Sequence, residues 1–123
     1  MKKLRFVVHK HKARRLHYDL RIQVGKNLRS FAIPKQPPLQ AGIKRLAIDT
    51  GKREIAALNF EGIIPKGHYG AGTLKIWDKG TFEFEKKKPK EILFIFKGKK
   101  LKGRYNLIKT RFGWLFIKSR KRF

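Results

Sequence analysis

Apolar and polar residues alternate strictly from Leu16 to Val24, which is the pattern of a β-strand with one buried face and one polar face. The apolar face carries Leu16, Tyr18, Leu20, Ile22 and Val24. The polar face carries His17, Asp19, Arg21 and Gln23. We therefore expect a strand that joins a hydrophobic core to a surface rich in reactive side chains.

Similar apolar stretches recur along the chain and are separated by turn-forming residues. They predict further strands at 5–9, 28–33, 45–49, 73–77, 81–85, 92–97, 104–110 and 114–118. Hairpin turns are expected at 25–27, 78–80 and 111–113, and short helices only at 13–16 and 51–58. The pattern predicts an all-β fold, a compact antiparallel β-barrel of about eight strands with one or two short helical turns, because closure removes the sheet edges.

The composition adds a strong positive charge to this picture. The chain has 123 residues, a length typical of one domain, so we expect a single β-barrel domain over residues 1–123. Its 33 lysines and arginines against 8 acids give a formal net charge of +25. Such a charge disfavours the compact state unless anions offset the repulsion, so nucleic acid is the expected partner.

An anionic membrane surface is the competing partner, but no apolar run approaches the roughly 18 residues of a spanning helix. The longest run, Ile92 to Phe96, has the length of one strand. No signal peptide is recognisable, and the absence of cysteine rules out disulfides, thiolate metal sites and cysteine nucleophiles. We expect a cytoplasmic, monomeric protein that does not bind membranes.

Two histidines and one acid can meet beside the polar face of the predicted strand. His17 and Asp19 are neighbours on that face, and a short bend would return His11 over them. Two imidazoles and a carboxylate leave coordination positions for water and substrate, as a catalytic metal requires. The spacing alone also fits an alternative, in which the histidines are surface residues and Asp19 pairs with an arginine.

Five segments carry a resemblance to a known family. They are KHKARRLHYDLRI at 10–22, SFAIPK at 30–35, KRLAI at 44–48, FEGIIPKGHYGAG at 60–72 and WLFIK at 114–118. In this order they resemble the 3′-phosphoesterase domain of the bacterial end-joining DNA ligase D, which also occurs as stand-alone proteins. The resemblance implies a manganese-dependent enzyme that trims 3′ ends of DNA or RNA-tailed DNA. It would remove a terminal ribonucleoside and then the remaining 3′-phosphate.

The resemblance also implies roles for individual residues. The manganese ligands of the family fall on His11, His17 and Asp19. Its phosphate-contacting cations fall on Arg21, Lys35 and Arg45, which suits the bidentate grip of arginine and the point charge of lysine. Other divalent transition metals are compatible with the same ligand set. The glycine-rich segment 62–72 is expected to shape the pocket wall, with His68 and Tyr69 outside the chemistry.

Three positions depart from the family pattern. His9 stands where the family usually has glutamine, Arg53 where it has an active-site histidine, and Ala57 where it has a tyrosine. A guanidinium stays protonated at neutral pH, so Arg53 can bind phosphate but cannot exchange a proton as histidine does. His9 or His68 could replace the missing imidazole if the fold brings either into the pocket. The expected catalytic set is Arg21, Lys35, Arg45, His9 and Arg53, of which the four cations also bind substrate.

Two main functions remain open at this point. The first is a metal-dependent phosphoesterase that processes DNA 3′ ends in repair and works beside a separate ligase or polymerase of end joining. The second is a non-catalytic basic barrel that binds nucleic-acid 3′ ends through a retained phosphate and metal cradle. A third reading, a plain basic barrel of ribosomal-protein type, would not need the reactive face of the strand.

Overall fold

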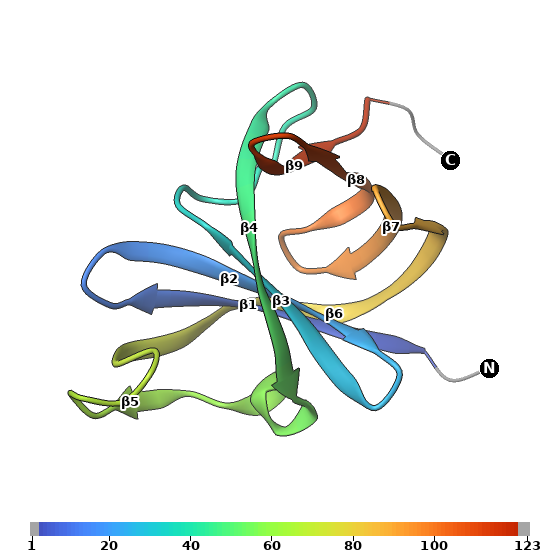
Figure 1. Ribbon diagram of the computed structural model, residues 1–123. Coiled ribbons are helices and arrows are strands. Elements are labelled where there is room, and N and C mark those ends of the chain that lie inside the picture. Colours follow the sequence, from blue (N-terminus) through green and yellow to red (C-terminus); the bar gives the residue numbers. More distant parts are fainter. Residues whose placement is uncertain (1–2, 121–123) are drawn as a thin grey trace.

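The computed structural model describes residues 3–120, which form nine strands and one 3-10 helix (Figure 1). The strands are β1 (Leu4–Lys12), β2 (Leu16–Val24), β3 (Asn27–Ile33), β4 (Lys44–Glu54), β5 (Gly62–Ile64), β6 (Gly72–Lys88), β7 (Glu91–Gly98), β8 (Lys102–Thr110) and β9 (Gly113–Lys118). The helix is η1 (Ile55–Asn59). Within the described residues, no helix is long and apolar enough to cross a membrane.

Eight of the described strands close into an antiparallel barrel. The strands neighbour one another in the order β1-β2-β3-β4-β9-β8-β7-β6, and β6 pairs again with β1. The short strand β5 adds to the free side of β6 outside this ring. The predicted all-β barrel is therefore confirmed.

The barrel interior is filled mainly by aromatic and branched side chains. Its fully buried members include Phe6, Leu20, Phe31, Phe94, Phe96, Tyr105 and Phe116. Phe6 and Phe96 meet edge to face with ring centroids 4.7 Å apart, a geometry that the ring quadrupoles favour. The hydroxyl of Tyr105 donates a 2.7 Å hydrogen bond to the carbonyl of Pro38, so the connection from β3 to β4 is tied to the core.

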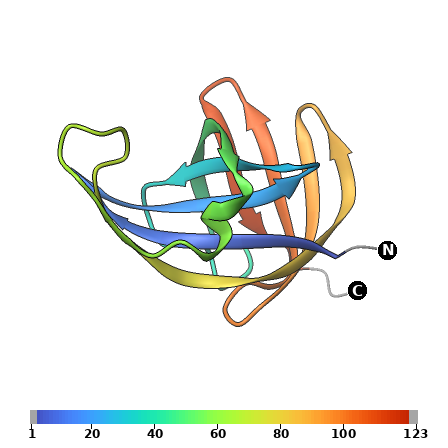
Figure 2. The same ribbon diagram turned by 90° about the horizontal axis from the view of Figure 1, so that it is seen from below.

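A second, smaller apolar cluster lies on the outside of the barrel. It consists of Val7, Leu28 and Leu58, with Ala57 and Ile76 packed against it. Figure 2 shows η1 and the segment leading to β5 crossing the outer side of β1 and β2. This cluster fixes η1 against the barrel wall, which creates a covered region on an outer face.

The two helices expected from the sequence are only partly present. Residues 13–15 form a bend between β1 and β2, so no helix occurs at 13–16. Residues 51–54 continue β4, and the helical turn covers Ile55–Asn59 instead of 51–58. Strand pairing of β4 with β3 satisfies the backbone of 51–54 and outweighs the weak local preference for a helix.

The hairpin expected at 78–80 is absent, because β6 continues through it for 17 residues. The carboxylate of Asp78 instead accepts backbone hydrogen bonds of 2.8–3.1 Å from Lys99, Lys100 and Leu101, and so holds the turn between β7 and β8. Gly80 is needed for close packing, since a Cβ there would lie 2.3 Å from the carbonyl oxygen of Lys97. Asp78 and Gly80 therefore serve contacts between strands, although they resemble a turn signal in the sequence.

Replacing Asp78 by alanine should destabilise the fold, because three backbone N–H groups lose a charged acceptor. We expect a loss of roughly 3 kcal/mol in the free energy of unfolding, measured by urea denaturation. Glu83→Ala, at an exposed position of the same strand, is the matched control and should cost at most about 0.5 kcal/mol. Equal losses in the two variants would contradict this role of Asp78.

Candidate functional site

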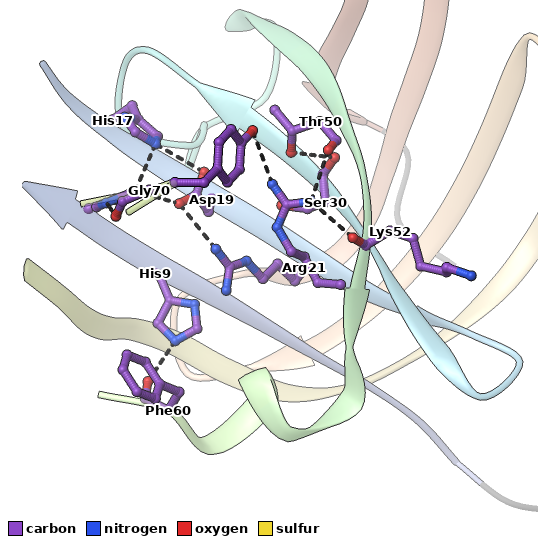
Figure 3. A network of polar contacts seen from close by, with 12 residues as sticks. His9, His17, Asp19, Arg21, Ser30, Thr50, Lys52, Phe60 and Gly70 are labelled. Carbon is purple, nitrogen blue, oxygen red and sulfur yellow. Dashed lines mark hydrogen bonds and ion pairs between the residues drawn. The ribbon is translucent and has the colours of Figure 1, made fainter. Parts of the chain in front are cut away.

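The polar face of β2 lies on the outside of the barrel, as the alternation predicts. Tyr18 and Leu20 are buried in the core, whereas His17, Asp19 and Arg21 point to the outer side (Figure 3). This outer face forms the floor of a cleft of about 690 Å³. The opposite wall is apolar and comes from η1, β5 and their connections: Ala56, Ala57, Phe60 and Ile64.

Three metal-type donors converge on the cleft floor. Strand pairing sets His11 of β1 directly opposite His17 of β2. The Nδ1 atom of His11 lies 3.1 Å from Nε2 of His17 and 3.0 Å from Oδ2 of Asp19. His17 Nε2 lies 3.1 Å from Oδ1 of the same carboxylate. The three residues predicted as a ligand set are thus within reach of a single point.

Backbone carbonyls orient both imidazoles. His11 Nε2 donates a 2.8 Å hydrogen bond to the carbonyl of Gly70, and His17 Nδ1 donates a 3.1 Å bond to the carbonyl of Arg15. Because a carbonyl only accepts, these bonds place a proton on the outer nitrogen of each ring. In the neutral rings, the lone pairs of the inner nitrogens then face each other and the carboxylate.

This arrangement fits a divalent transition metal. Three acceptors directed at one point repel one another unless a proton or a metal cation lies between them. Mixed imidazole and carboxylate donors suit manganese, iron or zinc better than magnesium or calcium, which prefer oxygen ligands alone. The second hydrogen bond of each ring is also typical of metal-bound histidine, because it fixes the tautomer.

The charges around Asp19 favour its ionised form. Burial alone would raise the pKa of Asp19, but the hydrogen bond and charge of His17, together with Arg21, hold it below the usual value. The hydrogen bond that the Asp19 carboxylate accepts from His17 in turn raises the pKa of His17. The guanidinium of Arg21 lies 3.4 Å from Oδ2 of Asp19 and is itself buried. The floor of the cleft is therefore a preorganised, paired set of charges.

Two guanidinium groups, those of Arg21 and Arg53, line the same cleft as the histidines. Arg53 donates 2.9 Å hydrogen bonds to the carbonyls of Thr50 and Lys52, and its Nη2 lies 3.4 Å from the hydroxyl of Tyr69. Its guanidinium also stacks 5.3 Å from the centre of the Tyr69 ring. Burial lowers the pKa of Arg21 and the charge of Arg53 adds to this effect, while the charge of Asp19 opposes it.

Several buried polar atoms in this region have no hydrogen-bond partner among the described residues. They are Nε of Arg21 and Oγ of Ser30, which are cross-strand neighbours on β2 and β3, and Nδ1 of His9. Unpaired buried polar atoms cost free energy, so those of the neighbouring Arg21 and Ser30 are typical of a site that a ligand completes. An anion held by Arg21 would satisfy the first of them.

Thr50 and Glu54 line the cleft, although no sequence pattern placed them there, and Tyr69 lines it as well. A β-bulge between Ser30 and Phe31, where Thr50 is the extra residue, turns the end of β4 toward the site. No local pattern marks this bulge. For Tyr69, the glycine-rich segment was a signal, since glycines at 67, 70 and 72 adopt the positive φ angles of the loop.

The remaining predicted site residues lie elsewhere. Lys35 is exposed after β3, and Arg45 donates a 2.8 Å hydrogen bond to the carbonyl of Gln36; neither lines the cleft. His9 is fully buried and donates a 2.8 Å hydrogen bond to the carbonyl of Phe60, while His68 is exposed. Neither of these imidazoles lines the cleft.

Comparison with known proteins shows the family of this chain. The family model described as the DNA ligase D 3′-phosphoesterase domain matches residues 9–109, a range that contains every residue of the metal-type cluster and both guanidiniums. The chain belongs to this family. The departures at Arg53 and Ala57 are therefore variations within the 3′-phosphoesterase domain family, at positions that face the cleft.

Three curated relatives show how the family domain is used in longer chains. The chain is 40% identical over 128 residues to the multifunctional non-homologous end joining protein LigD of Pseudomonas aeruginosa, covering 95% of this chain and 15% of that protein. It is 45% identical over 118 residues to LigD of Mycolicibacterium smegmatis, covering 87% of this chain and 16% of that protein. It is 41% identical over 109 residues to LigD of Mycobacterium tuberculosis, covering 85% of this chain and 14% of that protein. The chain thus spans about a sixth of these relatives or less.

The charge pairing on the cleft floor generates a stability prediction. Asp19→Ala should cost the metal-free protein roughly 3 kcal/mol, because it leaves the buried guanidinium of Arg21 beside Arg53 without its carboxylate. The double variant Asp19→Ala with Arg21→Met should recover part of this loss, since an apolar side chain of similar length replaces the unpaired charge. Urea denaturation in the presence of a chelator measures both. A double variant no more stable than Asp19→Ala would contradict the pairing.

Proposed function

We propose that this protein is a metal-dependent phosphoesterase that processes 3′ ends of DNA or RNA-tailed DNA during end-joining repair. The observation that carries the proposal is one cleft in which three metal-type donors lie beside two guanidinium groups. Family membership supports the reaction class, and the relatives are named as end-joining proteins. The net charge of +25 supports a polyanionic substrate.

In this proposal His11, His17 and Asp19 hold a divalent metal, manganese as the family resemblance implies. When bound, such an ion acts as a Lewis acid on a phosphate oxygen and lowers the pKa of water. The hydrogen bonds of His11 to Gly70 and of His17 to Arg15 keep the donor atoms in place before substrate arrives.

Arg21 and Arg53 are proposed to bind the 3′-terminal phosphate from the side opposite the histidines. Arg21 is buried against Asp19, so its position is fixed, and its free Nε can donate to a phosphate oxygen. Arg53 is held by two backbone carbonyls and by Tyr69, which leaves its charge directed at the cleft. Both guanidiniums stabilise the charge that develops on phosphate during transfer.

Proton transfer is the step that the cleft supports least. Arg53 stands where the family has a histidine and stays protonated, so it supplies charge but no exchangeable proton. Outside the ligand set, the cleft residues that can carry an exchangeable proton are Tyr69 and Glu54. Glu54 follows Arg53 in the chain, and the hydroxyl of Tyr69 lies close to the Arg53 guanidinium. We therefore expect slow turnover. This substitution also favours the alternative, a barrel that binds 3′ ends without turnover.

Metal and phosphate should bind cooperatively, because a site with one formal negative charge in so basic a chain is weak without a second anion. Calorimetric titration with Mn²⁺ should show about tenfold tighter binding in the presence of inorganic phosphate. His11→Ala should abolish binding. His68→Ala removes an exposed imidazole outside the cleft and should have no effect. Equal Mn²⁺ affinities for native protein and His11→Ala would rule out this metal site.

The activity test uses a primer-template with a 3′-phosphate or a single 3′-ribonucleotide, with Mn²⁺. The native protein should release product slowly, and Arg53→His should be about tenfold faster or more, because an imidazole restores acid–base catalysis. His11→Ala should be inactive. If the native protein and Arg53→His are both as inert as His11→Ala, while all retain DNA binding, the non-catalytic alternative replaces the enzyme.

A further inference from the structure

A second region of the molecule has a chemistry that the cleft does not explain. Strands β7 and β9 each contain an unbroken apolar run, Ile92 to Phe96 and Trp114 to Ile117. Continuous apolar runs are typical of strands that are covered on both faces. In the barrel only one face of each strand meets the core, through Phe94, Phe96 and Phe116.

The other face of these strands forms an apolar surface on the outside of the barrel. We call it the apolar face, and it consists of Leu46, Ile48, Leu93, Ile95, Ile108, Leu115 and Ile117. Strand register joins its centre, since Leu115 pairs with Leu46 on one side and with Ile108 on the other. Asn106 lies between Leu93 and Ile117, and Arg104 lies beside Ile95, so polar residues interrupt the face on β8. Leu46 is 41% exposed and Ile48 is 50% exposed, although one third of the chain is charged.

The apolar face is separate from the cleft. It uses the first half of β4 with β7, β8 and β9, whereas the cleft uses β1, β2, β3 and the second half of β4. None of its seven residues lines the cleft. A partner bound there would leave the cleft open to a DNA end.

The charges at its border indicate what kind of partner it fits. Lys44, which pairs with Ile117, and Arg111, beside the β8–β9 turn, are exposed cations. Two of the nearby acids are already paired, Glu85 with Arg104 and Glu91 with Lys86, which leaves Glu83 at the far edge. The border therefore has surplus positive charge around an aliphatic centre.

We infer that the apolar face is a docking surface for a partner protein whose contact surface is aliphatic at its centre and acidic at its rim. A second copy of this chain is disfavoured, because two chains of net charge +25 repel each other. Nucleic acid is disfavoured, because isoleucine and leucine offer bases no ring to stack on and phosphates no donor. The matched segment is at most 16% of each relative, so the domain works beside much other protein there.

The inference is tested by photo-crosslinking in cells that express the full chain. A benzophenone amino acid placed at Ile48 should form a discrete adduct with one protein, identified by mass spectrometry of the crosslinked peptide. The same probe at Ile63, which is 75% exposed on β5 away from the apolar face, is the matched control and should not form this adduct. The partner is then purified and its affinity for the native chain is measured by calorimetry.

Leu46→Lys and Ile48→Lys should each weaken this binding by about tenfold or more, while Ile63→Lys should not. Because these side chains are already partly exposed, both variants should keep the native Mn²⁺ affinity, which confirms that they fold. If neither variant folds, the inference is judged by the adduct at Ile48 and by the affinity of the native chain for the partner, which should fall as the salt concentration rises. An adduct only with nucleic acid or with a second copy, equal adducts at both positions, or no adduct would each overturn the inference.

Discussion

The pairing of β1 with β6 is the constraint on which the rest of the structure depends. It closes the ring of eight strands and leaves the described barrel without a free edge. It also brings the start of β6 against the end of β1 so closely that a Cβ at Gly72 would lie 2.2 Å from the carbonyl oxygen of Lys12. Because of this contact, the segment between β5 and β6 returns to β1, where Gly70 can accept the hydrogen bond from His11.

In the site on the outer face, charge pairing offsets the cost of removing charged side chains from water. Burying Asp19 and Arg21 removes both from water, which is costly unless each finds an opposite charge. Their mutual pairing, together with His11 and His17, meets that need and holds all four side chains in one geometry. The barrel wall supplies the rigidity, since paired strands cannot shift by one residue without turning the site into the core.

Arg53 changes the balance between binding and proton transfer in the cleft. In place of the family histidine it adds a permanent charge beside Arg21, which favours an anionic ligand between them. The stacking with Tyr69 and the two backbone carbonyls limit its freedom. Ala57, in place of the family tyrosine, belongs to the apolar wall opposite. The cleft thus contains one more permanent positive charge and one imidazole fewer than the family resemblance implies.

The sequence by itself determined the strand at 16–24 with His17, Asp19 and Arg21 on one face, because side-chain direction in a strand follows from a two-residue period. It also indicated the convergence of His11 with them, since a short bend must return the chain. Only the tertiary structure decided that Thr50 and Glu54 reach the cleft, that Lys35 and Arg45 do not, and that Asp78 holds a distant turn. These outcomes depend on register, a bulge and contacts between strands far apart in the chain, which no local pattern encodes.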